Sequence, residues 1–192
     1  MTPWILKADK LDKHFFLHEQ AREIPSTFQV DLELLPGQLL AITGPSGAGK
    51  SSLLKCIWRT YLPTGGHLWL READGTVTDL ATAGEQHMLA LRRTELGSVT
   101  QFLHCLPRKS ALDVVAQPLV DGGVPMQAAR EKAAQLLKRL NVPEHLWAVA
   151  PATFSGGEQQ RINLARGLIR PVRLLLLDEP TASLDPVSRE CA

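Results

Sequence analysis

The stretch GPSGAGKS, from Gly44 to Ser51, matches the pattern G-x-x-x-x-G-K-[ST]. Its glycines allow the backbone to curl so that several N–H groups face one anion. A helix that begins near Lys50 would add the positive end of its dipole, and the Lys50 ammonium would reach the β- and γ-phosphates of a nucleotide. The Ser51 hydroxyl is suited to binding Mg²⁺. The stretch therefore predicts a phosphate-binding loop.

The segments on either side of this loop have the patterns of a strand and a helix. Gln38 to Thr43 is a short apolar run that follows Pro36-Gly37, which is typical of a buried strand. Ser51 to Thr60 has its apolar side chains on one helical face. The order strand, glycine-rich loop, helix favours an α/β fold.

The rest of the chain predicts a hairpin, two more strands and two long helices. The expected elements are a hairpin at His67 to Leu80 with a type I′ turn at Asp74-Gly75, strands at Leu96 to Phe102 and Arg173 to Glu179, and helices at Pro125 to Leu140 and Ser155 to Arg170. We expect a mostly parallel sheet with a small antiparallel lobe and an inserted helical subdomain. As domain organisation we expect a single domain over 1–192, with its core in 1–100 and 171–192 and the helical subdomain in 101–170.

Two carboxylates follow the aliphatic run Leu174 to Leu177. Ligand sites of parallel sheets lie at the carboxyl ends of the strands. Asp178 would hold Mg²⁺, directly or through water, and Glu179 would polarise the water that attacks a γ-phosphate. The pattern by itself is weak evidence for a functional site, but the phosphate-binding loop upstream favours a role for both carboxylates in nucleotide chemistry.

The helix that begins at Ser155 has an unusual first turn. Ser155 and Glu158 have the spacing of a capping box, which any helix could use. The adjacent Gly156 and Gly157 are not explained by capping, since each costs about 1 kcal/mol of helix stability. A helix start that must let a phosphate approach the backbone closely would explain them.

Composition restricts the remaining function classes. A formal net charge of +1 gives no indication of a nucleic-acid partner. The three cysteines form no C-x-x-C pair, which argues against a disulfide framework and predicts a reducing, cytoplasmic location. No apolar run is long enough for a signal peptide or a membrane span, so we expect no direct membrane insertion. His14 and His18 lack a third ligand in a clear pattern, and we expect no metal there.

Together these motifs resemble the ATPase subunits of the ABC superfamily. GPSGAGKS resembles the Walker A motif, FSGGEQQ the signature and LLLLDE the Walker B motif, while Ser183-Leu184-Asp185 resembles the D-loop. Gln101 has the place of the Q-loop glutamine, and Phe15 that of the aromatic residue that stacks on adenine. The nucleotide-binding residues implied are Gly44, Pro45, Ser46, Gly47, Ala48, Gly49, Lys50, Ser51, Ser52 and Phe15.

The resemblance also implies roles for the other motifs. Glu179 and Gln101 would be catalytic, and Ser51, Gln101 and Asp178 would bind Mg²⁺. Two cassettes of this superfamily pair head to tail, so that each ATP lies between the Walker A motif of one and the signature of the other. A second ATPase subunit is therefore the implied partner, with the signature Ser155, Gly156, Gly157 and Glu158 and the D-loop Asp185 acting across the pair.

Phrases around the motifs suggest a subgroup. The PhnL-type subunits of the bacterial carbon–phosphorus lyase system are resembled by four phrases, Ser98 to Pro107, Ser110 to Pro125, Leu140 to Trp147 and Ala150 to Arg161. That resemblance implies a role in phosphonate breakdown, in the formation of ribose 1-methylphosphonate 5-triphosphate, with other lyase subunits as partners. The alternatives are the ATPase of a lipoprotein-releasing ABC exporter, whose signature is also close to SGGEQQR, and a nucleotide-gated module that does not hydrolyse ATP.

One departure from the superfamily concerns the segment after Asp185. Cassettes continue to a strand that lies between the Walker A and Walker B strands and ends in a histidine at the γ-phosphate, and none of the six histidines here follows the Walker B motif. Without that strand the two flanking strands would be about 5 Å further apart than a normal pair. We expect the 192 residues to be a fragment; another chain filling the gap, or a compromised fold, are the alternatives.

Overall fold

The computed structural model describes residues 4–17, 22–103 and 108–181. The chain divides into two compact units, Met1–Leu96 and Gly97–Ala192. Asp185 of the expected D-loop lies outside the described residues. The expected single domain and its internal boundaries stay a prediction.

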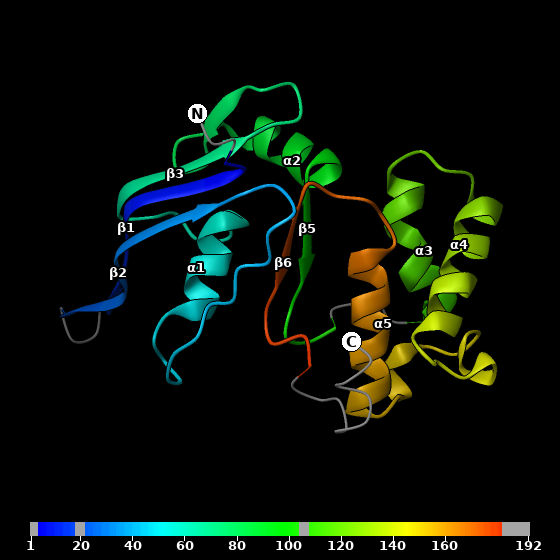
Figure 1. Cartoon of the computed structure of the whole chain (residues 1–192). Helices are drawn as coiled ribbons and strands as arrows, with labels where there is room; N and C mark the ends of the chain where they lie inside the picture. The colour runs from blue at the N-terminus through cyan, green and yellow to red at the C-terminus, as the bar shows by residue number, and fades with distance from the viewer. Residues whose placement is uncertain (1–3, 18–21, 104–107, 182–192) are drawn as a thin grey trace. The chain divides into compact units, whose positions relative to one another are not determined.

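The first unit is built on an antiparallel sheet with the strand order β2-β1-β3-β4 (Figure 1). Its strands are β1 (Leu6–Leu17), β2 (Arg22–Leu34), β3 (Gly65–Arg71) and β4 (Val77–Asp79). Leu6, Ala8 and Leu11 of β1 are buried, as are Leu68 and Leu70 of β3. These side chains form the apolar face of the sheet.

Strands β1 and β2 are long, yet their sequence does not alternate regularly. The register of the β1–β2 ladder shifts three times between Ala8 and His14. Lys10 and Gln29 take positive φ angles at these irregularities. Each bulge changes which face the following side chains point to, so the period-2 pattern is broken.

Two helices complete the first unit. Helix α1 (Lys50–Ile57) lies against β2 and buries Leu53, Cys56 and Ile57. Helix α2 (Glu85–Thr94) buries Met88 and Leu91. The helix expected after the phosphate-binding loop is therefore confirmed.

The hairpin expected between His67 and Leu80 is confirmed, but its turn differs. Trp69 pairs with Asp79 and Arg71 with Val77. In the turn Gly75 has a φ of 91°, whereas Asp74 does not take the positive φ that a type I′ turn requires. The Asp74 carboxylate instead accepts a hydrogen bond from the Thr76 N–H at 2.8 Å.

The strand expected at Gln38 to Thr43 is not formed. These residues have no regular structure and are exposed, with Leu39 86% exposed. A buried strand of a parallel sheet needs hydrogen-bonding neighbours. No strand in the described ranges pairs with this run. Its apolar composition was therefore not sufficient to make it a strand.

The second unit combines a short strand pair with helices. Strand β5 (Leu96–Val99), which crosses the boundary between the units, pairs with β6 (Leu174–Leu177). The helices are α3 (Ala111–Asp121), α4 (Met126–Arg139) and α5 (Gly156–Leu168), with 3₁₀ turns η2 (Glu144–Leu146) and η3 (Pro151–Thr153). The expected helices at Pro125 to Leu140 and Ser155 to Arg170 and the strand before Glu179 are confirmed.

Helices α3, α4 and α5 lie side by side (Figure 1). Their buried side chains form one apolar core. Its buried members include Val115 of α3, Leu137 of α4 and Ile162 of α5. Helix α5 also approaches β5 closely, because a Cβ added at Gly167 would lie 2.2 Å from Cγ2 of Val99. Helix α5 therefore packs against the other helices and against the strand pair.

These elements confirm the expected α/β fold with an antiparallel lobe and an inserted helical region. Within residues 4–17, 22–103 and 108–181, every helix is too short or too polar to span a bilayer.

Candidate functional site

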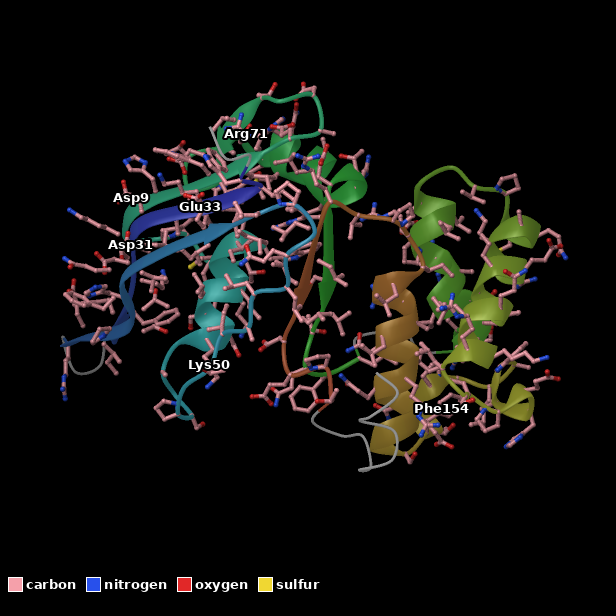
Figure 2. All side chains as sticks on the ribbon, in the orientation of Figure 1. Asp9, Asp31, Glu33, Lys50, Arg71 and Phe154 are labelled. Carbon is pink, nitrogen blue, oxygen red and sulfur yellow. The ribbon has the colours of Figure 1, made fainter. Side chains whose placement is uncertain are left out.

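The predicted phosphate-binding loop curls through glycines that a side chain would strain. Gly44, Gly47 and Gly49 have φ angles of 150°, 80° and 85°. Gly49 caps helix α1, so the backbone N–H groups of the first turn point back toward the loop. The Lys50 ammonium donates to the carbonyl oxygens of Gly44 and Pro45, each at 2.8 Å. Its charge thus lies within the curve of the loop, and Figure 2 shows Lys50 at the start of α1.

Strand β2 packs directly against this loop. A Cβ added at Gly49 would lie 1.8 Å from the carbonyl oxygen of Ser26. The Ser26 hydroxyl donates to the hydroxyl of Ser52 at 2.7 Å. The Thr27 hydroxyl is buried, with no hydrogen-bond partner among the described residues. Sequence reasoning missed Ser26 and Thr27, because nothing in their local pattern marks a contact with a loop more than twenty residues away.

Phe15, which the resemblance places at the adenine, lies in an aromatic and basic cluster. Its ring meets the ring of Tyr61 edge-on, with centroids 5.1 Å apart and an interplanar angle of 81°. The Lys13 ammonium lies 4.9 Å from the centroid of Phe15, and that of Lys55 lies 5.3 Å from the centroid of Tyr61. Tyr61 was not expected from the sequence.

In the second unit, the carboxylates after β6 lie beside the end of β5. The Asp178 N–H donates to the carbonyl of Val99 at 2.9 Å. Glu179 takes a left-handed backbone conformation with a φ of 48°. The Gln101 side-chain amide donates to Oε2 of Glu179 at 3.1 Å. The structure therefore brings together Gln101 and Glu179, two of the residues expected to be catalytic.

The first turn of α5 contains the expected capping box. The Ser155 N–H donates to Oε2 of Glu158 at 2.8 Å, and the Ser155 hydroxyl donates to the same atom at 2.7 Å. These bonds from the Ser155 hydroxyl and backbone hold the pKa of Glu158 below its usual range. Figure 2 shows Phe154 beside the start of this helix. Gly156 and Gly157 form the first turn itself.

The candidate residues thus form one group in each unit. The first unit holds the residues from Gly44 to Ser52 together with Phe15, and the second holds Gln101, Asp178, Glu179 and the start of α5. In the part of the chain that the structure describes, no three His, Cys, Asp or Glu side chains form a metal-binding group. Nδ1 of His14 lies 3.8 Å from Oε2 of Glu23, while His18 lies outside the described residues.

The family model described as "ABC transporter" matches residues 27–182. The chain belongs to the ABC transporter family. The family match includes the glycine-rich loop, the signature helix and the acidic strand end, which agrees with the motifs found in the sequence.

Curated relatives and solved structures support the same family. The chain is 38% identical over 187 residues to the "Lipoprotein-releasing system ATP-binding protein LolD" of Maricaulis maris, covering 97% of this chain and 78% of the relative. It is 37% identical over 185 residues to the protein of that name from Legionella pneumophila, covering 96% and 78%. The dimeric structure of MJ0796, "a Bacterial ABC Transporter Cassette", superposes with a TM-score of 0.87 at 29% identity, covering 97% of this chain and 79% of that chain.

A second MJ0796 structure shows a post-hydrolysis dimer bound to ADP and Pi, again with a TM-score of 0.87 and 28% identity, covering 97% of this chain and 79% of that chain. This chain is an ABC-type ATPase that binds ATP. Cassettes of this family dimerise, as the MJ0796 structure shows.

The prediction of a phosphonate-breakdown subunit is wrong. The relatives from Maricaulis maris and Legionella pneumophila, which align over 97% and 96% of the chain, are named for lipoprotein release and not for a carbon–phosphorus lyase system. One of the phrases that suggested a lyase subunit, Ala150 to Arg161, contains the signature itself, which marks the superfamily and not a subgroup. Part of one phrase, residues 104–107, also lies outside the described residues.

Proposed function

We propose that this chain is the ATP-hydrolysing subunit of a lipoprotein-releasing ABC system. The observation that carries the proposal is its identity of 38% over 97% of its length to a relative of that name, repeated at 37–42% in relatives from other bacteria. The natural partners are a second cassette and the membrane subunits of such a system.

In this proposal the loop from Gly44 to Ser52 holds the nucleotide phosphates. The curled backbone and the start of α1 supply N–H donors, and Lys50 supplies a positive charge beside them. The bonds from Lys50 to the carbonyls of Gly44 and Pro45 would be exchanged for bonds to phosphate oxygens. Phe15 contributes an aromatic ring for the base.

Ser51 in the first unit and Gln101 and Asp178 in the second unit are candidate ligands of magnesium. Their hydroxyl, amide and carboxylate oxygens are the hard ligands that Mg²⁺ prefers. The Gln101 amide nitrogen is engaged with Glu179, which leaves its amide oxygen for an ion. A bound Mg²⁺ would neutralise charge on the β- and γ-phosphates. The Glu179 carboxylate accepts a proton from the attacking water, and Gln101 orients that carboxylate.

The signature residues act on nucleotide held by the partner cassette. The first turn of α5 offers backbone N–H groups at Gly156 and Gly157, where no side chain keeps a phosphate away. Ser155 and Glu158 hold this turn through their capping box.

Lys50→Ala tests the nucleotide site. Losing the ammonium should weaken ATP binding at least about tenfold, because a charged hydrogen bond to phosphate contributes about 1.5–3 kcal/mol. Calorimetric titration with ATP measures the affinity. Lys7→Ala, which removes a lysine from β1, is the matched control. Equal affinity in Lys50→Ala and the unaltered chain would refute the assignment of the loop.

The cargo is tested in the host cell. Deleting the gene should leave lipoproteins in the membrane fraction, and the unaltered gene should restore their release. Genes that carry Lys50→Ala or Glu179→Gln should not restore lipoprotein release, because release needs ATP turnover. Normal lipoprotein release in the deletion strain would exclude this cargo while leaving the ATPase assignment in place.

A further inference from the structure

Two buried side-chain amides on helix α5 hold the backbone next to the residues assigned to hydrolysis. Gln160 is 3% exposed and Asn163 is 4% exposed. The Gln160 amide donates to the carbonyl of Pro180 at 2.7 Å, and Pro180 directly follows Glu179. The Asn163 amide donates to the carbonyl of Thr100 at 2.5 Å, and Thr100 directly precedes Gln101.

Glu179 needs such support because its backbone is strained. A non-glycine residue with a φ of 48° costs about 1–2 kcal/mol relative to ordinary conformations. It persists only where neighbouring contacts fix it. Here the N–H of Asp178 is bonded to Val99 and the carbonyl of Pro180 is bonded to Gln160, so the chain is held on both sides of Glu179.

The same helix fixes the other partner of the carboxylate. Asn163 anchors the backbone at Thr100, and the Thr100 hydroxyl in turn donates to the carbonyl of Phe102 at 2.7 Å. Gln101 lies between Thr100 and Phe102 in the chain, and its side-chain amide donates to Oε2 of Glu179 at 3.1 Å. One helix therefore supports both members of the Gln101–Glu179 pair.

We propose that Gln160 and Asn163 are positioning residues for ATP hydrolysis, which hold Glu179 and Gln101 in register from helix α5. The inference rests on the proposed role of Glu179. Helix α5 begins with the signature turn, so the element that meets the partner's nucleotide also holds the hydrolytic pair of its own chain. A displacement of α5 on closure of two cassettes would reach both carbonyls through these amides.

The experiment compares kcat with ATP affinity in the full chain. Asn163→Ala should lower kcat about ten- to hundredfold, since a shift near 1 Å at a catalytic group has effects of this size. The Kd for ATP should stay within about twofold, because the phosphate-binding loop is unchanged. Gln160→Ala should behave in the same way and carries the test if Asn163→Ala does not fold.

Ile162→Ala on the same helix is the matched control. Ile162 is buried in the core of the three helices, so its truncation lowers stability without touching either carbonyl. Its kcat should be unchanged at temperatures where the chain stays folded. An equal fall of kcat in Ile162→Ala and Asn163→Ala would overturn the proposal in favour of a merely structural role.

Asn163→Asp adds a readout that stability alone does not give. The introduced carboxylate faces the Thr100 carbonyl without a proton to donate, so kcat should fall at pH 8. Burial raises the pKa of this group, so the rate relative to the unaltered chain at the same pH should rise toward acidic pH. A kcat at pH 8 equal to that of the unaltered chain would refute the proposal. Weakened ATP binding in Lys50→Ala together with an unaltered kcat in Asn163→Ala would refute this inference and leave the proposed nucleotide site standing.

Discussion

A side chain at Gly49 would meet the backbone of strand β2. The added Cβ would lie 1.8 Å from the Ser26 carbonyl oxygen, in a conformation with a φ of 85° that side chains rarely adopt. Any other residue at this position would both clash with the Ser26 carbonyl and strain the backbone, so glycine is required. The G-x-x-x-x-G-K-[ST] pattern predicts the glycine from the curl of the loop, but the contact with Ser26 was not visible in it.

Gly49→Ala should lower the free energy of unfolding by about 3 kcal/mol or more, because overpacking adds to the backbone strain. Gly75→Ala is the control, since Gly75 has a φ of 91° but nothing within 4 Å of the added Cβ. It should cost only about 1 kcal/mol. Urea unfolding measures both, and equal costs would contradict the contact with β2.

A polar contact between side chains joins helices α3 and α4. The Arg130 guanidinium donates to Oδ1 of Asp113 at 2.7 Å, and the Ser110 hydroxyl donates to Oδ2 at 2.8 Å. The bond from Arg130 is the largest cause that holds the pKa of Asp113 below its usual range. Burial, the next largest effect, opposes it, and the bond from Ser110 adds to the lowering. Asp113 thus binds Ser110, the N-cap residue of α3, and links α3 to α4.

The pKa of Asp113 is lower in the folded chain than in the unfolded chain. The ionised carboxylate therefore stabilises the fold to its full extent at pH values above the ordinary pKa of about 4. That stabilisation is lost as the pH falls through the lowered value. Asp113→Asn should therefore reduce stability at pH 7, and the difference should shrink toward about pH 3. Urea unfolding across this range tests it, with Glu131→Gln as the control on α4, where Glu131 accepts from Gln127. A difference that does not change with pH would exclude the ionised carboxylate as the cause.

Helix α5 and strand β5 are in close contact at Gly167. Alanine is the better helix former by about 1 kcal/mol, yet its Cβ would lie 2.2 Å from Cγ2 of Val99. Gly167→Ala should therefore destabilise the chain. In a double-mutant cycle, Val99→Ala should remove most of this cost. Additive effects of the two changes would argue against the contact.

At the scale of the whole molecule, the proposed pair of cassettes should form only with ATP bound. Glu179→Gln keeps the binding residues and should block hydrolysis, so the variant should become dimeric when ATP and Mg²⁺ are added. Adding Ser155→Arg should leave ATP binding intact but prevent dimerisation, because the arginine would fill the space at the start of α5. Light scattering measures the mass, and Thr82→Arg, an exposed residue of the first unit, is the control. A dimer in the Ser155→Arg variant would remove the signature from the interface.

The subgroup within the family is indicated by similarity over the whole chain and not by any single motif. Motifs such as the signature are common to all cassettes, so they identify the family and not the transported cargo. Alignment over 187 residues overturned the phosphonate interpretation that short phrases had favoured.

Features that depend on residues close together in the chain could be predicted from the amino-acid sequence alone. The curl of the loop depends on glycines a few residues apart, the capping box on Ser155 and Glu158, and the acidic strand end on residues adjacent in the chain. Helices with a clear apolar stripe were predicted for the same reason.

Features that depend on residues far apart in the chain became visible only in the folded structure. Whether the apolar run at Gln38 to Thr43 pairs as a strand depends on partners elsewhere in the chain, and the bulges of β1 are defined only against β2. The bonds from Asn163 to Thr100 and from Gln160 to Pro180 join residues 63 and 20 positions apart. Hydrogen bonds of this kind require the chain to be folded back on itself, so no local pattern shows them.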